Sequence, residues 1–370
     1  MSELFFYFVF FLILSFVVID CLTKSRGRVG VQFYGVFVIL VSVAIARSVG
    51  FGSDDQAYVD IYEKIAGEGF LESLARYEYS NYNVEFGFFL LLGFLSLIGT
   101  SHFLVFGGVS LLAVYFNLRA IKSFTPYFVV SVLVYFSHFY IAKELNAVRV
   151  GLSSALLFYA ALAIYRNQWF RSLFVWLVAL LIHVSAVFFV LPVILYAMKP
   201  SRNHLIFLAL LIVSFSFMFS AKELAFYFTN FGFVGEKLSL YLSSDEFSYG
   251  IPLADVVNFK NISILVLAFF LWGRLVFNYS GFYLSFIFFY SATLFRIVFG
   301  DFAVLAGRGY SVISMFEFVL IPIVFVALLG RGLGLALAAI YALVMLWMNF
   351  NINTAWSGGV EFFHDWQNLW

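Results

Sequence analysis

Residues 125–165 read TPYFVVSVLVYFSHFYIAKELNAVRVGLSSALLFYAALAIY, two apolar runs joined by a short polar segment. The first run covers 125–142 and the second covers 150–165. A helix needs about 20 apolar residues to cross a membrane, since each residue adds about 1.5 Å. Both runs approach that length, and charges are confined to the junction between them. The stretch therefore predicts two consecutive membrane helices.

The same pattern continues along the whole chain of 370 residues. Hydrophobic residues make up 64% of the sequence and charged residues 11%, whereas a soluble domain carries about 25% charged residues. This composition cannot cover a surface with polar groups, but a helix surface that faces lipid is apolar in any case. The net charge of +1 lacks the basic footprint of a nucleic-acid-binding protein, so we expect no nucleic-acid partner.

Membrane helices are predicted at residues 4–22, 31–49, 103–118, 125–142, 150–165, 172–198, 203–220, 261–279, 281–299, 309–330 and 333–350. The segment 84–99 is apolar but short, so it either spans or forms a re-entrant or interfacial segment. We expect residues 51–83 and 221–260 to form external loops. The predicted fold is an all-α, polytopic transmembrane helical bundle of about 11–13 membrane helices. It would form a single integral membrane domain over 1–370.

The distribution of basic residues in short loops predicts the orientation. The loops expected in the cytoplasm contain Lys24, Arg26, Arg28, Arg119, Lys122, Arg166, Arg171, Lys199 and Arg202. The acidic loop from Asp54 to Glu85 is then expected outside.

Placing the basic loops on both sides of 172–198 in the cytoplasm requires that this run be broken near His183. The alternative is one long tilted helix. Non-helical backbone at membrane depth is tolerated around a protein-lined cavity. We favour the broken form, which points to a site.

A polar segment lies between the two predicted helices 125–142 and 150–165. Arg149 and Asn146 are three residues apart and share a helix face, with Glu144 close by. The planar guanidinium of an arginine binds phosphate or diphosphate oxygens bidentately. The segment is therefore a candidate anion site. The alternative is that Arg149 is an interfacial anchor that reaches toward lipid headgroups.

His183 lies within an apolar run and has no charged neighbour in sequence. Such an imidazole acts as a general base or as a hydrogen-bond donor to a substrate oxygen. The alternative is a neutral histidine bonded to a neighbouring carbonyl group.

A third group surrounds the junction 300–309 and contains Arg296, Arg308 and Tyr310, expected on the same membrane side as Arg149. The simpler interpretation is an ion pair of Asp301 with Arg296 or Arg308.

The acidic loop supplies the fourth group. Asp54, Asp55 and Glu85 are suited to contact sugar hydroxyls, and the adjacent aspartates to hold a divalent cation. A solvated acidic loop is the alternative. We predict no metal site, because no paired-histidine signature is present.

Four spaced motifs and a weaker fifth element carry a resemblance to a known family. They are Gly52-Ser53-Asp54-Asp55 followed by Tyr58, Glu85-Phe86-Gly87-Phe88, Asn146-Ala147-Val148-Arg149, Ile182-His183-Val184-Ser185-Ala186, and the weaker Arg308-Gly309-Tyr310. In this order they resemble the EpsG-like branch of the Wzy-type polysaccharide polymerases. The similarity covers roughly residues 50–200. The chain departs from the family pattern at Ser53, Phe86, Phe88 and Val150. Val150 replaces a glutamine, so no role of that glutamine is carried over.

The resemblance implies a GT-C-like membrane glycosyltransferase in the cytoplasmic (inner) membrane of a bacterium, with its active site facing the periplasm or exterior. The substrates would be oligosaccharide repeat units on undecaprenyl diphosphate, and the lipid diphosphate would be the leaving group of an inverting transfer. No cofactor, metal or nucleotide sugar would be needed. Membrane lipid, a flippase and a chain-length regulator would be partners. Arg149, His183, Glu144 and Arg308 would be catalytic. The substrate-binding residues would be Asn146, Asp54, Asp55, Glu85, Arg296 and Tyr310.

Two other classes remain open. A transporter or flippase of lipid-linked oligosaccharides shares the hydropathy, although no related halves are visible in this sequence. A ligase-like transferase shares the chemistry and differs in its acceptor, and an acyltransferase would modify the finished glycan.

Overall fold

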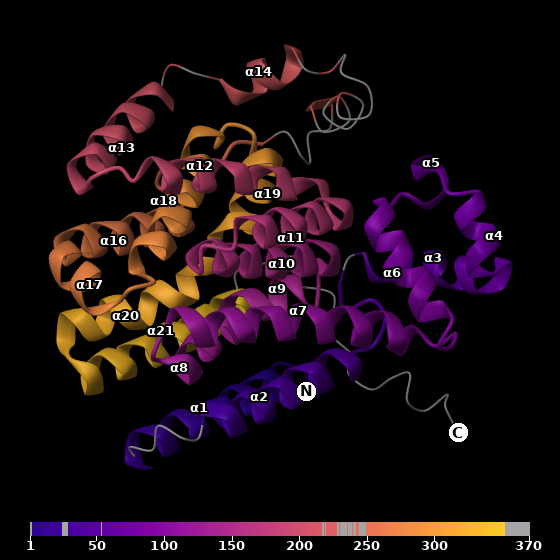
Figure 1. Ribbon diagram of the computed structural model, residues 1–370, viewed down its shortest axis with the longest axis horizontal. Coiled ribbons are helices and arrows are strands. Elements are labelled where there is room, and N and C mark those ends of the chain that lie inside the picture. The colour runs from indigo at the N-terminus through magenta and orange to yellow at the C-terminus, as the bar shows by residue number, and fades with distance from the viewer. Residues whose placement is uncertain are drawn as a thin grey trace. The chain divides into compact units, whose positions relative to one another are not determined.

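The computed structural model is built of helices (Figure 1). The structure describes residues 2–23, 29–52, 54–216 and 249–351, together with 218, 220–227, 229, 235, 239 and 242–243. No strand occurs in these ranges, which confirms the all-α prediction. Ser53 and the basic loop residues Lys24, Arg26 and Arg28 lie outside the described residues.

Within the described ranges, four helices are long and apolar enough to cross a membrane, or up to six if each of two bent helix pairs is one span. The four are His102–Phe124, Val148–Tyr165, Ala303–Leu329 and Arg331–Asn351. A helical membrane bundle is thereby confirmed. Seven further apolar helices have 10–17 residues within the fully described part of the chain, so they do not pass the same length test.

The chain divides into two compact units, Met1–Ala186 with Ile321–Trp370, and Val187–Leu320. The first, called unit 1, contains α1 (Ser2–Thr23), α2 (Val29–Ile45), α3 (Asp55–Glu68), α4 (Phe70–Ala75), α5 (Tyr79–Tyr82), α6 (Phe86–Ser96), α7 (His102–Phe124), α8 (Phe128–Val134), a π-helical stretch (Tyr135–Tyr140), α9 (Ile141–Lys143), α10 (Val148–Tyr165), α11 (Trp169–Ile182) and α21 (Arg331–Asn351). The expectation of a single integral domain stays a prediction.

The second, called unit 2, contains α12 (Val190–Met198), α13 (Arg202–Ser216), α14 (Ala221–Tyr227), α16 (Val256–Phe270), α17 (Trp272–Asn278), α18 (Phe282–Val298) and α19 (Ala303–Ile313). A 3-10 stretch (Val184–Phe189) and α20 (Glu317–Leu329) connect the units along the chain. Helices α16 and α17 are bent by 77° at Leu271, so the predicted span 261–279 is not straight.

Helix α10 is the centre of unit 1, where it packs between α7 and α11 (Figure 1). Small residues such as Gly151, Ser154 and Ala155 are buried along it. Small side chains let helix backbones approach closely in a membrane, where packing rather than hydrophobicity drives association. Ser153 adds an interhelical bond, since its Oγ donates to the carbonyl oxygen of Ala179 on α11 at 3.1 Å.

The predicted break in the run 172–198 is present at His183. Helix α11 ends at Ile182, and His183 has extended backbone angles of φ −156° and ψ 126°. The alternative of one continuous helix through this run is therefore wrong.

Two other segments of unit 1 differ from simple spans or loops. Helix α6, within the predicted segment 84–99, has 11 residues, which is about half of what a crossing needs. The predicted external loop 51–83 is folded into α3, α4 and α5, and α3 and α4 pack on α6. In 221–260, the predicted loop extends too far, because α16 begins at Val256.

Candidate functional site

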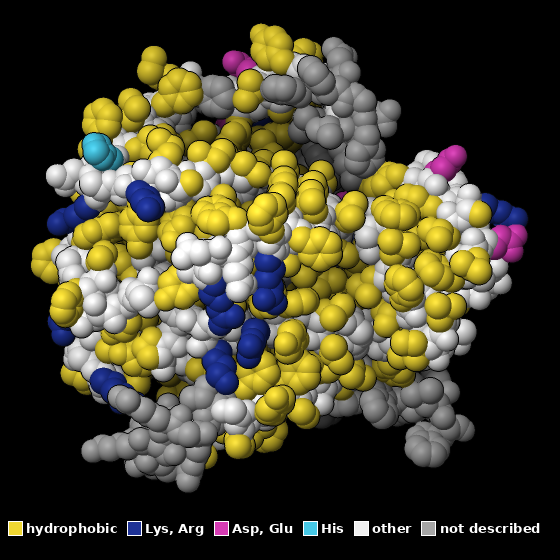
Figure 2. Space-filling model, viewed as in Figure 1, with side chains coloured by type: hydrophobic (Ala, Val, Ile, Leu, Met, Phe, Trp, Pro, Cys, Tyr) yellow, Lys and Arg dark blue, Asp and Glu magenta, His cyan; other side chains and the backbone are white. Residues whose placement is uncertain are grey.

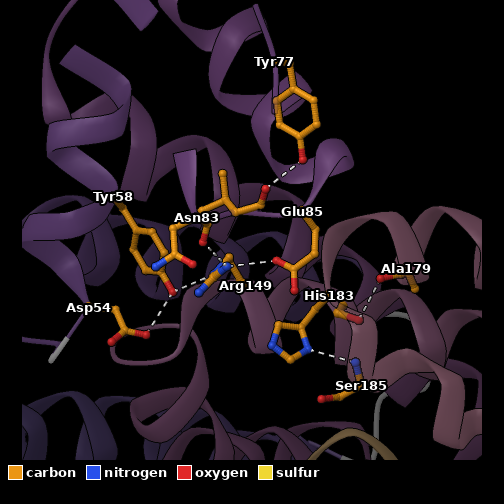
Figure 3. A network of polar contacts seen from close by, with 11 residues as sticks. Asp54, Tyr58, Tyr77, Asn83, Glu85, Arg149, Ala179, His183 and Ser185 are labelled. Carbon is orange, nitrogen blue, oxygen red and sulfur yellow. Dashed lines mark hydrogen bonds and ion pairs between the residues drawn. The ribbon is translucent and has the colours of Figure 1, made fainter. Parts of the chain in front are cut away.

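Arg149 is the centre of a polar cluster in unit 1 (Figure 3). It lies in the first turn of α10, and its Nη1 donates to Glu85 Oε2 at 2.9 Å and to the Asn83 carbonyl oxygen at 3.3 Å. Its Nε donates to the hydroxyl of Tyr58 at 3.1 Å. The Arg149 side chain keeps 19% of its surface exposed, and no hydrogen bond to Nη2 is found in the described part of the chain. Its second terminal nitrogen can therefore bind an oxyanion.

The acceptors reach Arg149 because a tight turn precedes α6. Asn83 ends α5 in the left-handed conformation, with φ 52°, which asparagine tolerates better than most residues. Glu85 is the N-cap residue of α6. Two residues later, Gly87 packs against the backbone of Leu181, and an added Cβ would lie 2.8 Å from it. This close contact holds the start of α6 against the end of α11.

Tyr58 connects Arg149 to the acidic loop. Its hydroxyl donates to Asp54 Oδ2 at 3.2 Å, one turn earlier at the start of α3, while it accepts from Arg149. Burial raises the pKa of Tyr58 to about 12, so the phenol stays protonated at neutral pH and keeps this direction. Asp54 itself is exposed. The cluster thus includes one carboxylate that is exposed on its surface.

His183 belongs to the same end of the helix pair. Arg149 lies one turn before Ser153 on α10, and His183 lies one turn after Ala179 at the end of α11. The bond between Ser153 and Ala179 joins two antiparallel neighbours, so both one-turn steps lead to the same end of the pair. Arg149 and His183 therefore lie at the same end of this helix pair, and Figure 3 draws both in one close-up.

The imidazole of His183 has a defined tautomer. Its Nδ1 accepts a hydrogen bond from the backbone N–H of Ser185 at 3.2 Å, and the residue is 6% exposed. An imidazole nitrogen that accepts has no hydrogen, so the neutral ring carries its hydrogen on Nε2. In this arrangement Nε2 is a donor. Between the two roles considered for His183, the geometry favours hydrogen-bond donation over general-base action.

The two adjacent aspartates have opposite environments. Asp55 is fully buried and pairs with Arg47, whose Nη1 lies 2.9 Å from Asp55 Oδ2. The same carboxylate oxygen accepts from the Gly52 N–H at 2.8 Å, and Arg47 Nη1 also donates to the Leu145 carbonyl oxygen. The predicted contact of Asp55 with sugar hydroxyls stays a prediction, since its carboxylate is buried in this pair. The pair connects the loop before α3 to the turn before α10.

Asn146 and Glu144 lie in that turn and have different surroundings. Asn146 is partly exposed, and an added Cβ at Gly52 would lie 2.8 Å from its carbonyl oxygen. Glu144 is buried, and its Oε1 accepts from Tyr135 Oη at 2.5 Å and Asn117 Nδ2 at 2.9 Å. Glu144 thus belongs to an interior network, and its predicted catalytic role is not supported by exposure.

The third predicted group lies in unit 2. Arg296 pairs with Asp255 at 2.7 Å rather than with Asp301, whose Oδ2 instead accepts from Ser220 at 2.8 Å. The hydroxyl of Tyr310 lies 3.4 Å from Glu317 Oε2.

Helix α19 begins at Ala303 and not at the predicted residue 309, so Arg308 lies within this helix. Its side chain is partly exposed. The structure thus places the Arg149 cluster in unit 1 and the Arg308 group in unit 2. Their predicted convergence stays a prediction.

Sequence reasoning missed several polar partners. They are Arg47, Asn117, Tyr135, Asp255, Asn258, Lys260, Asn261 and Glu317. The available signal was their charged, amide or hydroxyl group within or beside apolar runs, where such groups are costly unless paired. Among the described residues, no group of three or more His, Cys, Asp and Glu is arranged to hold a metal ion.

Known proteins resemble this chain over most of its length. The model of the EpsG family matches residues 30–361. The amylovoran biosynthesis protein AmsC of Erwinia amylovora is 24% identical over 315 residues, which cover 80% of this chain and 80% of that protein. No solved structure matches the chain. Because the family match extends over nearly its whole length, this multi-pass membrane protein belongs to the EpsG family.

Proposed function

We propose that this chain is a membrane glycosyltransferase that polymerises lipid-diphosphate-linked oligosaccharide repeat units into a surface polysaccharide. Membership of the EpsG family and similarity to a protein of amylovoran biosynthesis support the class of product. The observation that carries the proposal is the Arg149 cluster, in which a cation with an available nitrogen lies beside an exposed carboxylate and a histidine donor.

The transfer needs a cation at the leaving group. The bond from the anomeric carbon to the diphosphate oxygen breaks, and its electron pair stays on the diphosphate. Arg149 binds that developing charge through Nη2, while Glu85 and Tyr58 hold the other nitrogens in place. Donors that are oriented before the reaction stabilise such charge most effectively. His183 adds a second donor from Nε2.

The attacking sugar hydroxyl must lose a proton as its oxygen bonds to the anomeric carbon. Asp54 is the exposed carboxylate of the cluster and takes this proton in our proposal. The Tyr58 hydroxyl orients its carboxylate. A general base acts within hydrogen-bond reach of the proton that it removes. Direct displacement from the face opposite the diphosphate inverts the anomeric centre.

The remaining predicted residues have other roles. Asp55 and Glu144 act as positioning residues, because both are buried and paired within unit 1. Asn146 contacts substrate beside Arg149. Arg308, with Arg296 and Tyr310, supplies a second cationic region for the diphosphate of the other substrate.

The charge distribution supports the proposed orientation in a bacterial cytoplasmic membrane. Acidic side chains lie over α4 and α5 beside a basic side chain, and further basic side chains gather over α7, α10 and α11 (Figure 2). Basic loops remain in the cytoplasm. The acidic end, which carries Asp54 and Glu85, then faces the exterior, where flipped lipid-linked repeat units are available.

The test uses a strain that lacks the gene and is complemented with variants at equal protein level. Arg149→Lys keeps the charge but loses the fork that holds Glu85 and Tyr58 at once, so we expect chains to shorten to single repeat units. Arg76→Lys is the matched control, because Arg76 is 64% exposed in an exposed pair with Glu72. Surface glycan is resolved by gel electrophoresis.

The pattern of products separates the alternatives. A polymerase defect leaves single repeat units on the cell surface. A flippase defect removes surface glycan altogether, and a ligase defect leaves polymer that is not transferred to its acceptor. Polymer of wild-type length in the Arg149→Lys strain would exclude the assignment.

A further inference from the structure

A cavity lies in unit 1 between the beginning of α2 and the end of α7. It has a volume of about 150 Å³, several times the roughly 30 Å³ that a water molecule takes up in the liquid. Its lining residues are Gly30, Phe33, Tyr34, Phe37, Tyr115, Arg119 and Lys122. A phosphoryl group fits this space.

The lining comes from two helix stripes that face each other. On α7, Tyr115, Arg119 and Lys122 follow the spacing of one helix face. On α2, Gly30 and Phe33 belong to the opposing stripe, and Lys122 Nζ lies 5.7 Å from the Phe33 ring centroid. The cavity is therefore formed by regular secondary structure and not by a loose surface loop.

The cations of this cavity have no acidic partner among the residues that the structure describes. Arg119 and Lys122 are exposed, and neither forms an ion pair with any residue that the structure describes. The sequence from 86 to 143 contains no Asp or Glu. Gly30 lies in the first turn of α2, where the helix dipole also favours an anion. The electrostatics of the cavity thus select a negatively charged group.

The surroundings select a lipid. Val31, Val38 and Leu111 on the same two helices are 73%, 61% and 46% exposed, which suits contact with acyl chains. Tyr34 and Tyr115 are 69% and 42% exposed at the cavity, and tyrosine is enriched where membrane meets water. Basic pockets between membrane helices on the cytoplasmic side bind anionic headgroups.

We propose that this cavity binds the phosphodiester headgroup of an anionic membrane phospholipid, with its acyl chains lying along α2 and α7. Arg119 and Lys122 bind the phosphate, and the aromatic side chains enclose it. The bound lipid fixes the beginning of α2 against α7. This site is separate from the Arg149 cluster and does not depend on the proposed reaction.

The test measures lipid bound to the purified full-length protein by native mass spectrometry, with phosphatidylglycerol and phosphatidylcholine as probes. We expect selective retention of phosphatidylglycerol. Each basic residue near an anionic surface contributes about 1 kcal/mol. Because 1.4 kcal/mol is tenfold, Arg119→Gln with Lys122→Gln should weaken retention roughly 30-fold.

A steric variant distinguishes the cavity from general charge attraction. A Cβ added at Gly30 meets nothing within 4 Å, so Gly30→Leu places its side chain in the cavity and keeps both cations. It should abolish selective retention. Gly332→Leu is the matched control, because Gly332 lies in the helix α21 with the same open space. Should Gly30→Leu fail to fold, Phe33→Ala tests the aromatic wall with the same expected loss of selectivity.

Three outcomes would overturn the proposal. One is equal retention of the two lipids by the wild type. Another is phosphatidylglycerol retention in Gly30→Leu equal to that of Gly332→Leu. The third is full displacement of the lipid by millimolar inorganic phosphate, which would show a site for free phosphate instead.

Discussion

The buried ion pair of Arg47 and Asp55 gives the sharpest stability prediction. Both side chains are 0% exposed and their charged atoms lie 2.9 Å apart. Asp55→Asn keeps the size of the side chain and an acceptor for the Gly52 N–H, but removes the charge opposite Arg47. Removing one partner of a buried pair costs about 3–5 kcal/mol, because the remaining charge is buried without compensation. We expect a loss of that size in the free energy of unfolding.

The assay is thermal unfolding of the purified protein in detergent, with glycan polymerisation as a second measurement. The control is Glu72→Gln, which breaks the pair with Arg76, whose side chains are 56% and 64% exposed. Such exposed pairs contribute about 0–1 kcal/mol. Arg47→Met combined with Asp55→Asn should recover part of the loss, since no unpaired charge then remains buried.

The pair also positions the candidate site, since Asp54 precedes Asp55 directly and Leu145 lies four residues before Arg149. Asp55→Asn should therefore lower polymerisation even where the protein remains folded. A melting temperature no lower than that of Glu72→Gln would refute the reasoning. The reasoning would also be refuted if the double variant lost more free energy of unfolding than the two single variants lose together.

Three further predictions concern residues around the cluster. Burial raises the pKa of Glu144 to about 7, so between its ordinary value of 4.5 and about 7 the folded chain holds a proton that the unfolded chain has released. The free energy of unfolding should then fall as pH rises through this window, by up to about 3 kcal/mol, and Glu144→Gln should remove this pH dependence. Thermal unfolding at pH 5 and pH 8 measures it, and an equal difference between the two pH values in the wild type and in Glu144→Gln would contradict the prediction. Tyr58→Phe removes the hydroxyl between Arg149 and Asp54. It should slow polymerisation about tenfold or more, because a hydrogen bond to a charged group contributes about 1.5–3 kcal/mol. A wild-type rate in membrane vesicles would argue against a role of this hydroxyl. Gly87→Ala should separate α6 from α11 and shorten the polymer, whereas Gly67→Ala, whose added Cβ meets nothing within 4 Å, should not; equal chain lengths for the two would show that the close packing is irrelevant.

The helices of this chain are largely predictable from sequence, because their cause is local. Apolar runs such as 150–165 become helical wherever backbone groups must bond within their own segment. The break at His183 was also predictable, since the basic residues on both sides of 172–198 conflict with a single crossing. The positions at which several apolar helices end were not predictable, because a helix end depends on what packs against it.

The candidate site shows the same division. The motifs around Arg149 and His183 were recognisable as polar groups in apolar surroundings, but their partners were not. Glu85 and Tyr58 are 64 and 91 residues away from Arg149 in sequence, and no local pattern pairs them. Only the packing of α3 on α6, of α6 on α11 and of α11 on α10 brings them together.

Asp54 and Asp55 mark the limit most clearly. In sequence they are equivalent neighbours, and both were assigned to substrate. Sequence alone determined that carboxylates would follow the second apolar run and that the chain would be a helical membrane protein. Tertiary structure decided that Asp55 is buried against Arg47 and that Asp54 stays exposed, because Arg47 binds Asp55 and the carbonyl oxygen of Leu145 at the same time.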